Sequence, residues 1–597
     1  MVKSNAYGVT PQWLDERYDS IVSACHKQNI THIGITASIT GKLLTSPEKL
    51  RDLKERLIND GITCWAEIVS IGHPAMGKYY DSSGRPPKSD LFWDGDLIIT
   101  TGDNVELLPR GWQYAINEFG NPVYCTACPN EAWLRGNLRV LNELAPIFDE
   151  IWYDDDFRLD GDQGAGKPHT STAACYCDNC LEELSKRVGK RITREDIVSD
   201  QVLHNAWIEA KVDKLTSMWN TLSHKARQIN SKLRLGLMVR WGGEERDGID
   251  IDKILACSGS DTLLRAGEGH FTRNEFTLPE SQAIEYLSAS YHISWFPPQT
   301  KVWSETTYFI GVTQEDILKK IALTLGAGAQ ELSYCPCVPE WIEEQNFLGE
   351  KLEFIKILGD SFTNAGLIYQ PIAILRTKSA GYGNQSPLQR IRDRQPFPLF
   401  SLAGICAQVI RQNHWCDTDN QKILAITGRS VWDFNTGNLR DRHLILDGSA
   451  LLEGAPLNAQ LGLTNITKTS NGRVDFSGGD FIKDGLLYSS SNITIIPYVW
   501  QDVPESLLNQ LLYDIRRVIG SKTLSVVVGG DLCVLPVHYR HNDYDAILLV
   551  NLTHTPREID LHLKGTRKYL YDQGGMPIDK HLILVPDEVR IIIARDS

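Results

Sequence analysis

Short apolar runs alternate with helix-like stretches through roughly the first 340 residues of this 597-residue chain, and that alternation restricts the fold more than any other feature. Strand-like runs lie at 31–37, 63–71, 122–128, 149–157, 233–241, 261–271, 301–309 and 330–337, and helix-like stretches at 46–59, 131–145, 202–228, 249–256, 278–286 and 313–326. Eight strands that alternate with helices predict a (β/α)8 TIM barrel, an α/β fold. A doubly wound parallel sheet gives the same alternation and is the alternative. The barrel is favoured because polar and aromatic residues gather at the C-terminal ends of the strands.

The remainder of the chain changes in pattern twice. A helix expected at 343–358 closes the barrel. Beyond it, strand-like runs at 373–375, 423–426 and 443–447, with a helix expected at 399–413, predict a second α/β domain. Short β-branched runs at 524–528, 544–551, 557–563 and 589–594 then predict a small β-sandwich. The predicted domains are 1–360, 361–522 and 523–597.

Charge and composition exclude several classes of protein. The formal net charge of −14 provides no basic face for a nucleic acid or an anionic membrane. No apolar run approaches the ~20 residues that a spanning helix needs. The first residues, 1–6, are expected to lead into a polar turn and a helix, without the apolar stretch of a signal peptide. These features predict a soluble, cytoplasmic protein.

The ends of the predicted strands carry the candidate site. The fourth strand ends in Asp154, Asp155, Asp156, Phe157 and Arg158; the fifth in Arg240 and Trp241; the sixth in Glu268 and His270; the seventh in Trp303 and Glu305; the eighth carries Tyr334 and is followed by Trp341. Active sites of such barrels lie at this face. Carboxylates that face one another among Trp and Tyr side chains predict a sugar-binding site, because aromatic rings stack on pyranose rings while carboxylates and Arg bind hydroxyls.

Two of these carboxylates suit glycoside hydrolysis, which generally needs an acid on one side of the scissile bond and a nucleophile or base on the other. Asp156 and Glu305 meet across the barrel if they cap the fourth and seventh strands. Consecutive Asp residues repel one another, which raises a pKa as a general acid requires. Glu268 is the rival nucleophile; otherwise it binds a hydroxyl or orients Arg240 or His270. A solvated acidic loop or a helix cap is the alternative for the Asp run.

A cluster of cysteines predicts a metal site. The chain has 13 Cys, an odd number that does not suggest a disulfide framework in a chain without a signal peptide. Cys175, Cys177 and Cys180 lie within six residues, and Cys128 is the candidate for a fourth ligand, with Cys125 as runner-up. Four thiolates leave no open position, so a bound zinc would be structural. Reduced thiols without metal are the alternative. Cys335 and Cys337 are expected to pack in the barrel.

The order of these motifs resembles the β-galactosidases of glycoside hydrolase family 42, which belong to the clan of retaining (β/α)8 glycosidases. The resemblance is carried by Cys128-Pro129-Asn130, then Asp154-Asp155-Asp156, then the three-cysteine run. It implies that the four Cys bind zinc, that Glu305 is the nucleophile and Asp156 the acid/base, and that Asp155 contacts the sugar 2-hydroxyl. It also implies that the second domain is flavodoxin-like and mediates trimerisation, and that the enzyme acts on β-galactoside-like substrates from the chain end.

The chain departs from the family pattern at the fourth strand. The triplet is Asp-Asp-Asp where the family has Asp-Asn-Glu, so the acid is one methylene shorter. A shorter acid widens the carboxylate gap by about 1.5 Å, which leaves an inverting mechanism and a different sugar specificity open. A barrel that binds carbohydrate without catalysis is a further alternative. A zinc-dependent hydrolase is a third, opposed by the lack of an open coordination position. The sequence therefore predicts an outlying relative of the family.

Overall fold

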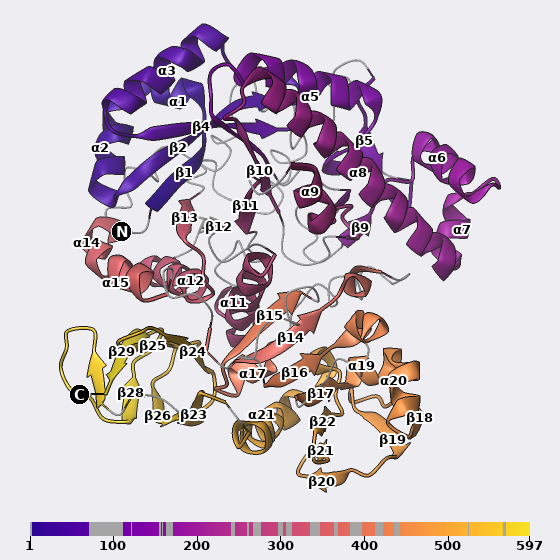
Figure 1. The fold of residues 1–597 in the computed structure, drawn as a ribbon, viewed down its shortest axis with the longest axis vertical. Coiled ribbons are helices and arrows are strands. Elements are labelled where there is room, and N and C mark those ends of the chain that lie inside the picture. Colours follow the sequence, from indigo (N-terminus) through magenta and orange to yellow (C-terminus); the bar gives the residue numbers. More distant parts are fainter. Residues whose placement is uncertain are drawn as a thin grey trace.

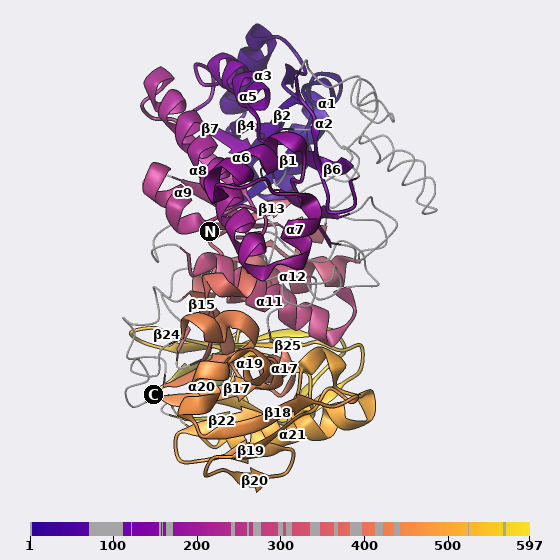
Figure 2. The ribbon, with the colours of Figure 1, turned by 90° about the vertical axis from the view of Figure 1, so that its right-hand side faces the viewer.

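The computed structural model describes residues 3–70, 111–120, 122–154, 157, 159–162, 171–239, 245–258, 262–266, 276–295, 302–305, 313–334, 347–362, 368–369, 371–382, 397–411, 422–434, 442–522, 524–564, 567 and 569–596. The barrel forms one end of an elongated molecule, and an α/β domain and a β-sandwich lie side by side at the other end (Figures 1 and 2). No helix in the described ranges has the length and apolar character to cross a membrane.

Eight parallel strands close into a barrel. They are β1 (Lys3–Val9), β2 (Ile30–Ile39), β4 (Thr63–Val69), β7 (Glu150–Tyr153), β10 (Arg234–Met238), β11 (Leu263–Ala266), β12 (Val302–Glu305) and β13 (Glu331–Tyr334). Each strand pairs with the next, and β1 pairs with both β2 and β13, which closes the sheet. The predicted (β/α)8 barrel is therefore confirmed, and a doubly wound open sheet is excluded.

Helices form the outer layer of the barrel. They include α2 (Tyr18–Gln28), α3 (Pro47–Asn59), α5 (Glu131–Leu144), α8 (Gln201–Ile229), α9 (Ile251–Ser258), α11 (Pro279–Ile293), α12 (Gln314–Gly326) and α15 (Leu352–Phe362). Helix α3 shows why such segments are helical. Ser46 caps it by accepting a hydrogen bond from the Lys49 amide, and Pro47 fits its first turn. Leu50, Leu53 and Leu57 then recur at helical spacing and are buried against the barrel.

Two expectations about the barrel strands are wrong. Residues 3–9 form the first strand rather than a turn before a helix. The side chains of Asn5 and Tyr7 lie inside the barrel: Asn5 donates from Nδ2 to the Leu332 carbonyl (3.1 Å) and accepts from Ser333 Oγ (2.7 Å). The segment predicted at 122–128 is not a barrel strand but β6 (Pro122–Ala127), which forms a hairpin with β5 (Tyr114–Ile116). The two errors offset each other, so 150–153 is still the fourth strand and 302–305 the seventh.

Three indole rings fill the barrel interior. Trp65 of β4, Trp152 of β7 and Trp303 of β12 pack together, with ring centroids 4.2 to 5.6 Å apart. Glycines on neighbouring strands make room for them: a Cβ on Gly34 would lie 2.3 Å from Trp65, and one on Gly236 would lie 2.1 Å from Trp152. We call Trp65, Trp152 and Trp303 the indole floor. These three side chains fill the centre of the barrel, so it is not an open pore.

The α/β domain contains a seven-stranded sheet. The strands are, in spatial order, β15 (Ala407–Arg411), β14 (Ile372–Arg376), β16 (Ile423–Ile426), β17 (His443–Asp447), β22 (Ile493–Ile496), β21 (Leu487–Ser489) and β20 (Ile482–Asp484). The first five are parallel and follow the order 2-1-3-4-5 of flavodoxin-like folds. The helices α17 (Leu399–Leu402), α19 (Gly448–Glu453), α20 (Ala455–Gln460) and α21 (Glu505–Gly520) and the hairpin β18 (Leu463–Lys468)–β19 (Val474–Gly478) complete this region.

The helix expected at 399–413 is largely wrong. Of the described residues 399–411, only α17 is helical, and the same segment continues as β15. All five residues of β15 are buried, Gln408 and Arg411 included, so the strand has no alternation of buried and exposed positions by which sequence could distinguish it from a buried helix.

The C-terminal β-sandwich has two antiparallel sheets. One contains β23 (Val526–Gly530), β26 (Arg557–Leu563) and β28 (His581–Leu584); the other contains β24 (Val534–Arg540), β25 (Asp545–Asn551), β29 (Val589–Arg595) and β27 (Tyr569–Asp572). Inward residues such as Val528, Ile547 and Ile559 form a core of their own between the sheets. The predicted boundaries at 360 and 522 stay predictions.

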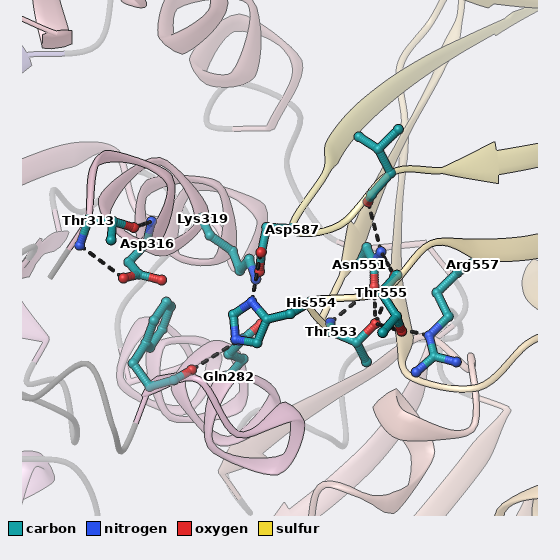
Figure 3. A network of polar contacts seen from close by, with 12 residues as sticks. Gln282, Thr313, Asp316, Lys319, Asn551, Thr553, His554, Thr555, Arg557 and Asp587 are labelled. Atoms are coloured by element: carbon teal, nitrogen blue, oxygen red, sulfur yellow. Dashed lines mark hydrogen bonds and ion pairs between the residues drawn. The ribbon is translucent and has the colours of Figure 1, made fainter.

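A polar network joins the barrel to the sandwich (Figure 3). Lys319 of α12, whose side chain is 0% exposed, forms an ion pair with Asp587. Asp587 also accepts from His554 Nδ1 at 2.7 Å. We call Lys319, Asp587 and His554 the sandwich junction. It fastens an outer helix of the barrel to a turn between two strands of the sandwich.

The α/β domain contacts the barrel through different ion pairs. Lys378 Nζ lies 2.5 Å from Asp250 Oδ2, and Arg411 Nη2 lies 2.7 Å from Asp252 Oδ2. Asp250 and Asp252 lie at the start of α9, in the connection that follows β10. We call these two pairs the α/β junction. Since the connections after barrel strands form the active face of this fold, the junction lies close to the candidate site.

Candidate active site and cysteine cluster

The closed barrel brings the ends of β7 and β12 to one face. All eight strands are parallel, so their C-terminal ends form a common mouth. Strands β10 and β11 separate β7 from β12 on one side, and four strands separate them on the other. Glu305 is the last residue of β12 and pairs in register with Ser333 of β13. The ends of β7 and β12 therefore lie at well-separated positions on the rim of this mouth.

Most of the predicted contact residues follow strand ends directly. Asp155, Asp156, Arg158, Arg240, Trp241, Glu268, His270 and Trp341 lie outside the described residues, and of Glu305 only the strand position is described. Strands β7, β10 and β11 end at Tyr153, Met238 and Ala266, a few residues before the predicted groups. Their predicted roles in catalysis and substrate binding stay predictions.

The chain is anchored on both sides of the Asp triplet. The Asp154 amide donates to the Ile68 carbonyl of β4 at 3.1 Å. Phe157 is buried, with its ring 5.4 Å from that of Trp219 and 5.6 Å from that of Trp133. The Leu159 amide then donates to the Asp247 carbonyl at 2.7 Å, so the connection after β7 is tied to the connection after β10.

The two described aromatic candidates are packed. Trp303 belongs to the indole floor and is 3% exposed. Tyr334 is 1% exposed and belongs to the core between the strands and the helices, where burial raises the pKa of its hydroxyl. The structure therefore gives both side chains a packing role and leaves their predicted contact with a substrate untested.

Sequence reasoning gave no role to four polar residues that lie inside the barrel. Arg265 of β11 donates from Nη1 to the Tyr7 hydroxyl of β1 at 2.7 Å, and both side chains are buried. Glu67 of β4 accepts a hydrogen bond from Thr36 of β2, and both are also buried. A signal was present, since these residues alternate with apolar residues along their strands. Only the register of the closed barrel shows that the polar positions face inward.

The four predicted cysteines lie together. The Sγ atoms of Cys128, Cys175, Cys177 and Cys180 all lie within 4.8 Å of one another, and Cys128 Sγ is 3.5 Å from Cys177 Sγ and 4.0 Å from Cys180 Sγ. Four thiolates at about 2.3 Å from a tetrahedral zinc stand about 3.8 Å apart. The cluster therefore has the donor set and the spacing of a closed zinc site.

Donors surround the cluster, as a group of thiolates requires. The Ile116 amide donates to Cys175 Sγ at 3.4 Å. Lys214 Nζ lies 3.9 Å from Cys180 Sγ and 2.7 Å from Glu183 Oε2. Burial lowers the pKa of Lys214, but Cys180 and Glu183 outweigh it and raise that pKa overall. Hydrogen bonds from the neighbouring cysteines, that from Cys128 first, hold the pKa of Cys177 well below its usual range.

No protein family model matches this chain, and no curated protein sequence matches it. The similarity that exists is structural.

Solved structures of glycosidases match the chain along its whole length. A β-galactosidase from Bacillus circulans sp. alkalophilus is 12% identical, with a TM-score of 0.63, and the match covers 100% of this chain and 99% of that one. A catalytic mutant of Gan42B, a GH42 β-galactosidase from G. stearothermophilus, is 10% identical, with a TM-score of 0.62 and coverage of 99% and 98%. An α-L-fucosidase isoenzyme from Paenibacillus thiaminolyticus is 11% identical, with a TM-score of 0.62 and full coverage of both chains.

These similarities establish the fold. The matches span the barrel, the α/β domain and the C-terminal β-sheets of this chain, and a GH42 β-galactosidase is among them, as the resemblance of the motifs predicted. The neighbours act on different sugars, and all of them are distant in sequence. The choice of sugar is therefore a question for this chain's own residues.

Proposed function

We propose that this protein is a glycoside hydrolase, a retaining and exo-acting enzyme on β-galactoside-like substrates, with Glu305 as nucleophile and Asp156 as acid/base. The observation that carries the proposal is the closed barrel, in which β12 ends at Glu305 and β7 ends three residues before Asp156, both at one mouth. The indole floor supports it, because a dry base under the mouth strengthens electrostatic interactions with a developing charge.

The chemistry follows from two carboxyl groups. The Glu305 carboxylate attacks the anomeric carbon while the Asp156 carboxylic acid donates its proton to the leaving oxygen. A covalent glycosyl-enzyme forms and the aglycon leaves. Asp156, now ionised, takes a proton from water, which attacks the anomeric carbon and restores Glu305. Asp155 and the residues Arg158, Arg240, Trp241, Glu268, His270 and Trp341 are proposed to bind the sugar.

The test is hydrolysis of a panel of nitrophenyl glycosides by wild type, Glu305→Ala and Asp156→Ala. The panel contains β-galactoside, β-glucoside, β-fucoside, β-xyloside and α-L-fucoside. We expect release of one sugar by wild type and loss of turnover in Glu305→Ala. Asp156→Ala should retain activity on nitrophenyl glycosides relative to natural glycosides, because a good leaving group needs no protonation.

Controls decide the mechanism. The anomer first formed, observed by NMR, is the substrate's own for retention and the opposite one for inversion. Azide should restore turnover to Glu305→Ala with an inverted product if Glu305 is the nucleophile. Equal loss on good and poor leaving groups would contradict the acid role of Asp156. Sugar binding without hydrolysis of any glycoside would favour a non-catalytic barrel.

We also propose that Cys128, Cys175, Cys177 and Cys180 hold a structural zinc ion. Support comes from the four sulfur atoms, their spacing and the donors around them. The zinc would fasten the hairpin β5–β6 to the start of α6 (Asp178–Val188), and four thiolates leave no position for a substrate. Wild type purified without chelators should contain about one zinc per chain. Cys128→Ser should lose it, whereas Cys257→Ser, outside the cluster, should keep it.

The trimeric assembly and the cytoplasmic location stay proposals. Five parallel strands in flavodoxin-like order support the analogy between the second domain and the trimerisation domain of the resembling family. Light scattering on the purified chain tests it, since a trimer has three times the mass of 67.1 kDa. A monomer would assign the second domain another role.

A further inference from the structure

Arg265 is unusual among the strands of the barrel. In the described residues of the eight strands it is the only buried Lys or Arg, at 3% exposure. Its neighbour Leu263 belongs to the cluster of the indole floor, whereas Leu264 and Ala266 pack toward the helices. The side chain of Arg265 therefore lies inside the barrel, where an unneutralised charge is costly.

The hydrogen bond between Arg265 and Tyr7 crosses the barrel. Arg265 lies on β11 and Tyr7 on β1, and β12 and β13 lie between these two strands in the sheet. Arg265 pairs in register with Trp303, two residues before Glu305. Arg265 and Tyr7 therefore face the barrel interior from either side of β12 and β13, and β12 is the strand that ends at Glu305.

We propose that Arg265, held by Tyr7, is a positioning residue for Glu305. The proposal rests on the proposed function, which makes Glu305 the nucleophile. The positive charge of Arg265 favours the ionised form of the Glu305 carboxyl group, and the link to Tyr7 fixes the cation. Tyr7 itself is held by stacking on Trp65, with ring centroids 6.4 Å apart, so the indole floor, the phenol and the guanidinium form one rigid support.

Other charged groups oppose this effect, so a cation is needed there. Glu67 of β4 is buried in the same interior, and Glu331 lies at the opposite end of β13. Like charges raise the pKa of a carboxyl group and burial acts in the same direction. Among the described residues of the barrel strands, Arg265 is the buried cation that acts in the opposite direction, whereas Arg234 pairs with Glu150.

The first test is the pH dependence of kcat/KM, whose acidic limb reports ionisation of the nucleophile in the free enzyme. Arg265→Met should move this limb to higher pH by about one unit, the effect of removing an opposite charge at close range. Arg265→Lys keeps a cation and should move it less. Tyr7→Phe keeps the cation and should lower kcat/KM with a smaller displacement of the limb.

A matched control excludes a general effect of losing a barrel arginine. Arg234 lies on β10 at the other end of the barrel, where it pairs with Glu150 at 2.5 Å. Arg234→Met should leave the acidic limb in place. A uniform loss of kcat/KM in Arg265→Met without movement of the limb would show a merely structural role and overturn the proposal.

A second test does not depend on activity. The midpoints of urea denaturation are compared for wild type, Arg265→Met, Glu305→Gln and the double variant. If the two groups interact, the double variant loses less than the two single losses together. Additive losses overturn the proposal. A wild type that hydrolyses no glycoside would overturn the proposed function alone, because this comparison would still decide the interaction.

Discussion

The sandwich junction and the α/β junction attach two domains to the same barrel by ion pairs, yet they differ in burial and in what they reach. Lys319 is 0% exposed and its partner Asp587 is 21% exposed. At the α/β junction the cation Lys378 is 43% exposed while Asp250 is 4% exposed, and Arg411 is buried against a partly exposed Asp252. The first junction buries a lysine, whereas the second leaves its lysine in solvent.

The two junctions also differ in how directly hydrogen bonds connect them to the candidate site. The sandwich junction holds α12, an outer helix. The α/β junction holds the start of α9, next to Asp247, whose carbonyl accepts from the Leu159 amide in the connection after β7. We therefore expect substitutions at the sandwich junction to lower the stability of the protein, and substitutions at the α/β junction to lower its activity.

The largest effect on stability is expected for Asp587→Ala. This change leaves Lys319 buried without the carboxylate that pairs with it, and loss of one partner of a buried pair costs about 3–5 kcal/mol of the free energy of unfolding. Urea denaturation measures the loss. Activity per folded molecule should be unchanged, and a fall in kcat/KM would contradict the contrast between the junctions. Lys319→Met removes the buried charge itself and should cost less.

Asp250→Ala should cost less stability and more activity. Asp250 Oδ1 accepts from the amides of Asp252 and Lys253 at 3.1 and 3.3 Å, so its loss uncaps α9 at a cost of about 1–2 kcal/mol. A shift of the connection after β10 should also displace the connection after β7 and lower kcat/KM by about tenfold or more. Asp250→Asn keeps the cap and should retain most activity. Full activity in Asp250→Ala would show that the α/β junction does not influence the candidate site.

Acid should weaken the sandwich junction. Burial raises the pKa of Asp587, but the hydrogen bonds from Lys319 and His554 outweigh it and lower that pKa overall. A carboxyl group with a lowered pKa stabilises the fold above its unfolded pKa of about 3.9, and this contribution is lost as the pH falls through the folded value. The difference in urea midpoint between wild type and Lys319→Met should therefore shrink from pH 6 to pH 3. A constant difference would contradict this linkage.

The smallest effects are expected for the exposed members of each junction. His554→Ala removes a side chain that is 45% exposed, and Lys378→Met one that is 43% exposed. Exposed ion pairs contribute about 0–1 kcal/mol, so each variant should stay within 1 kcal/mol of wild type in urea. A larger loss in Lys378→Met would show that the α/β junction depends on its exposed cation.

The sequence predicted those features of the molecule whose residues lie close together in the chain. Cys175, Cys177 and Cys180 are close in the chain, so their grouping needed only one distant partner, Cys128, and the structure brings that partner to them. The ends of β7 and β12 were likewise found, because apolar runs that end in polar residues mark both strands. Strand 3–9 was missed because its inward side chains, Asn5 and Tyr7, are polar and hide the period of a strand.

The interior of the barrel was beyond sequence reasoning for a different reason. Arg265 and Tyr7 are 258 residues apart, and their hydrogen bond depends on how far each strand is shifted against the next. Nothing in the local pattern encodes that shift. The hairpin β5–β6 was mistaken for a barrel strand because its apolar run has the composition of one and only its antiparallel partner reveals its place.

The tight fit of the indole floor over Gly34 and Gly236 makes the chain open to chemical rescue. Trp152→Gly would leave a dry cavity of the size of an indole ring beneath the mouth. Apolar cavities of this kind take up small aromatic molecules. Free indole should refill the hole and restore part of the lost stability. The stability of the barrel would then depend on the concentration of a small molecule in solution.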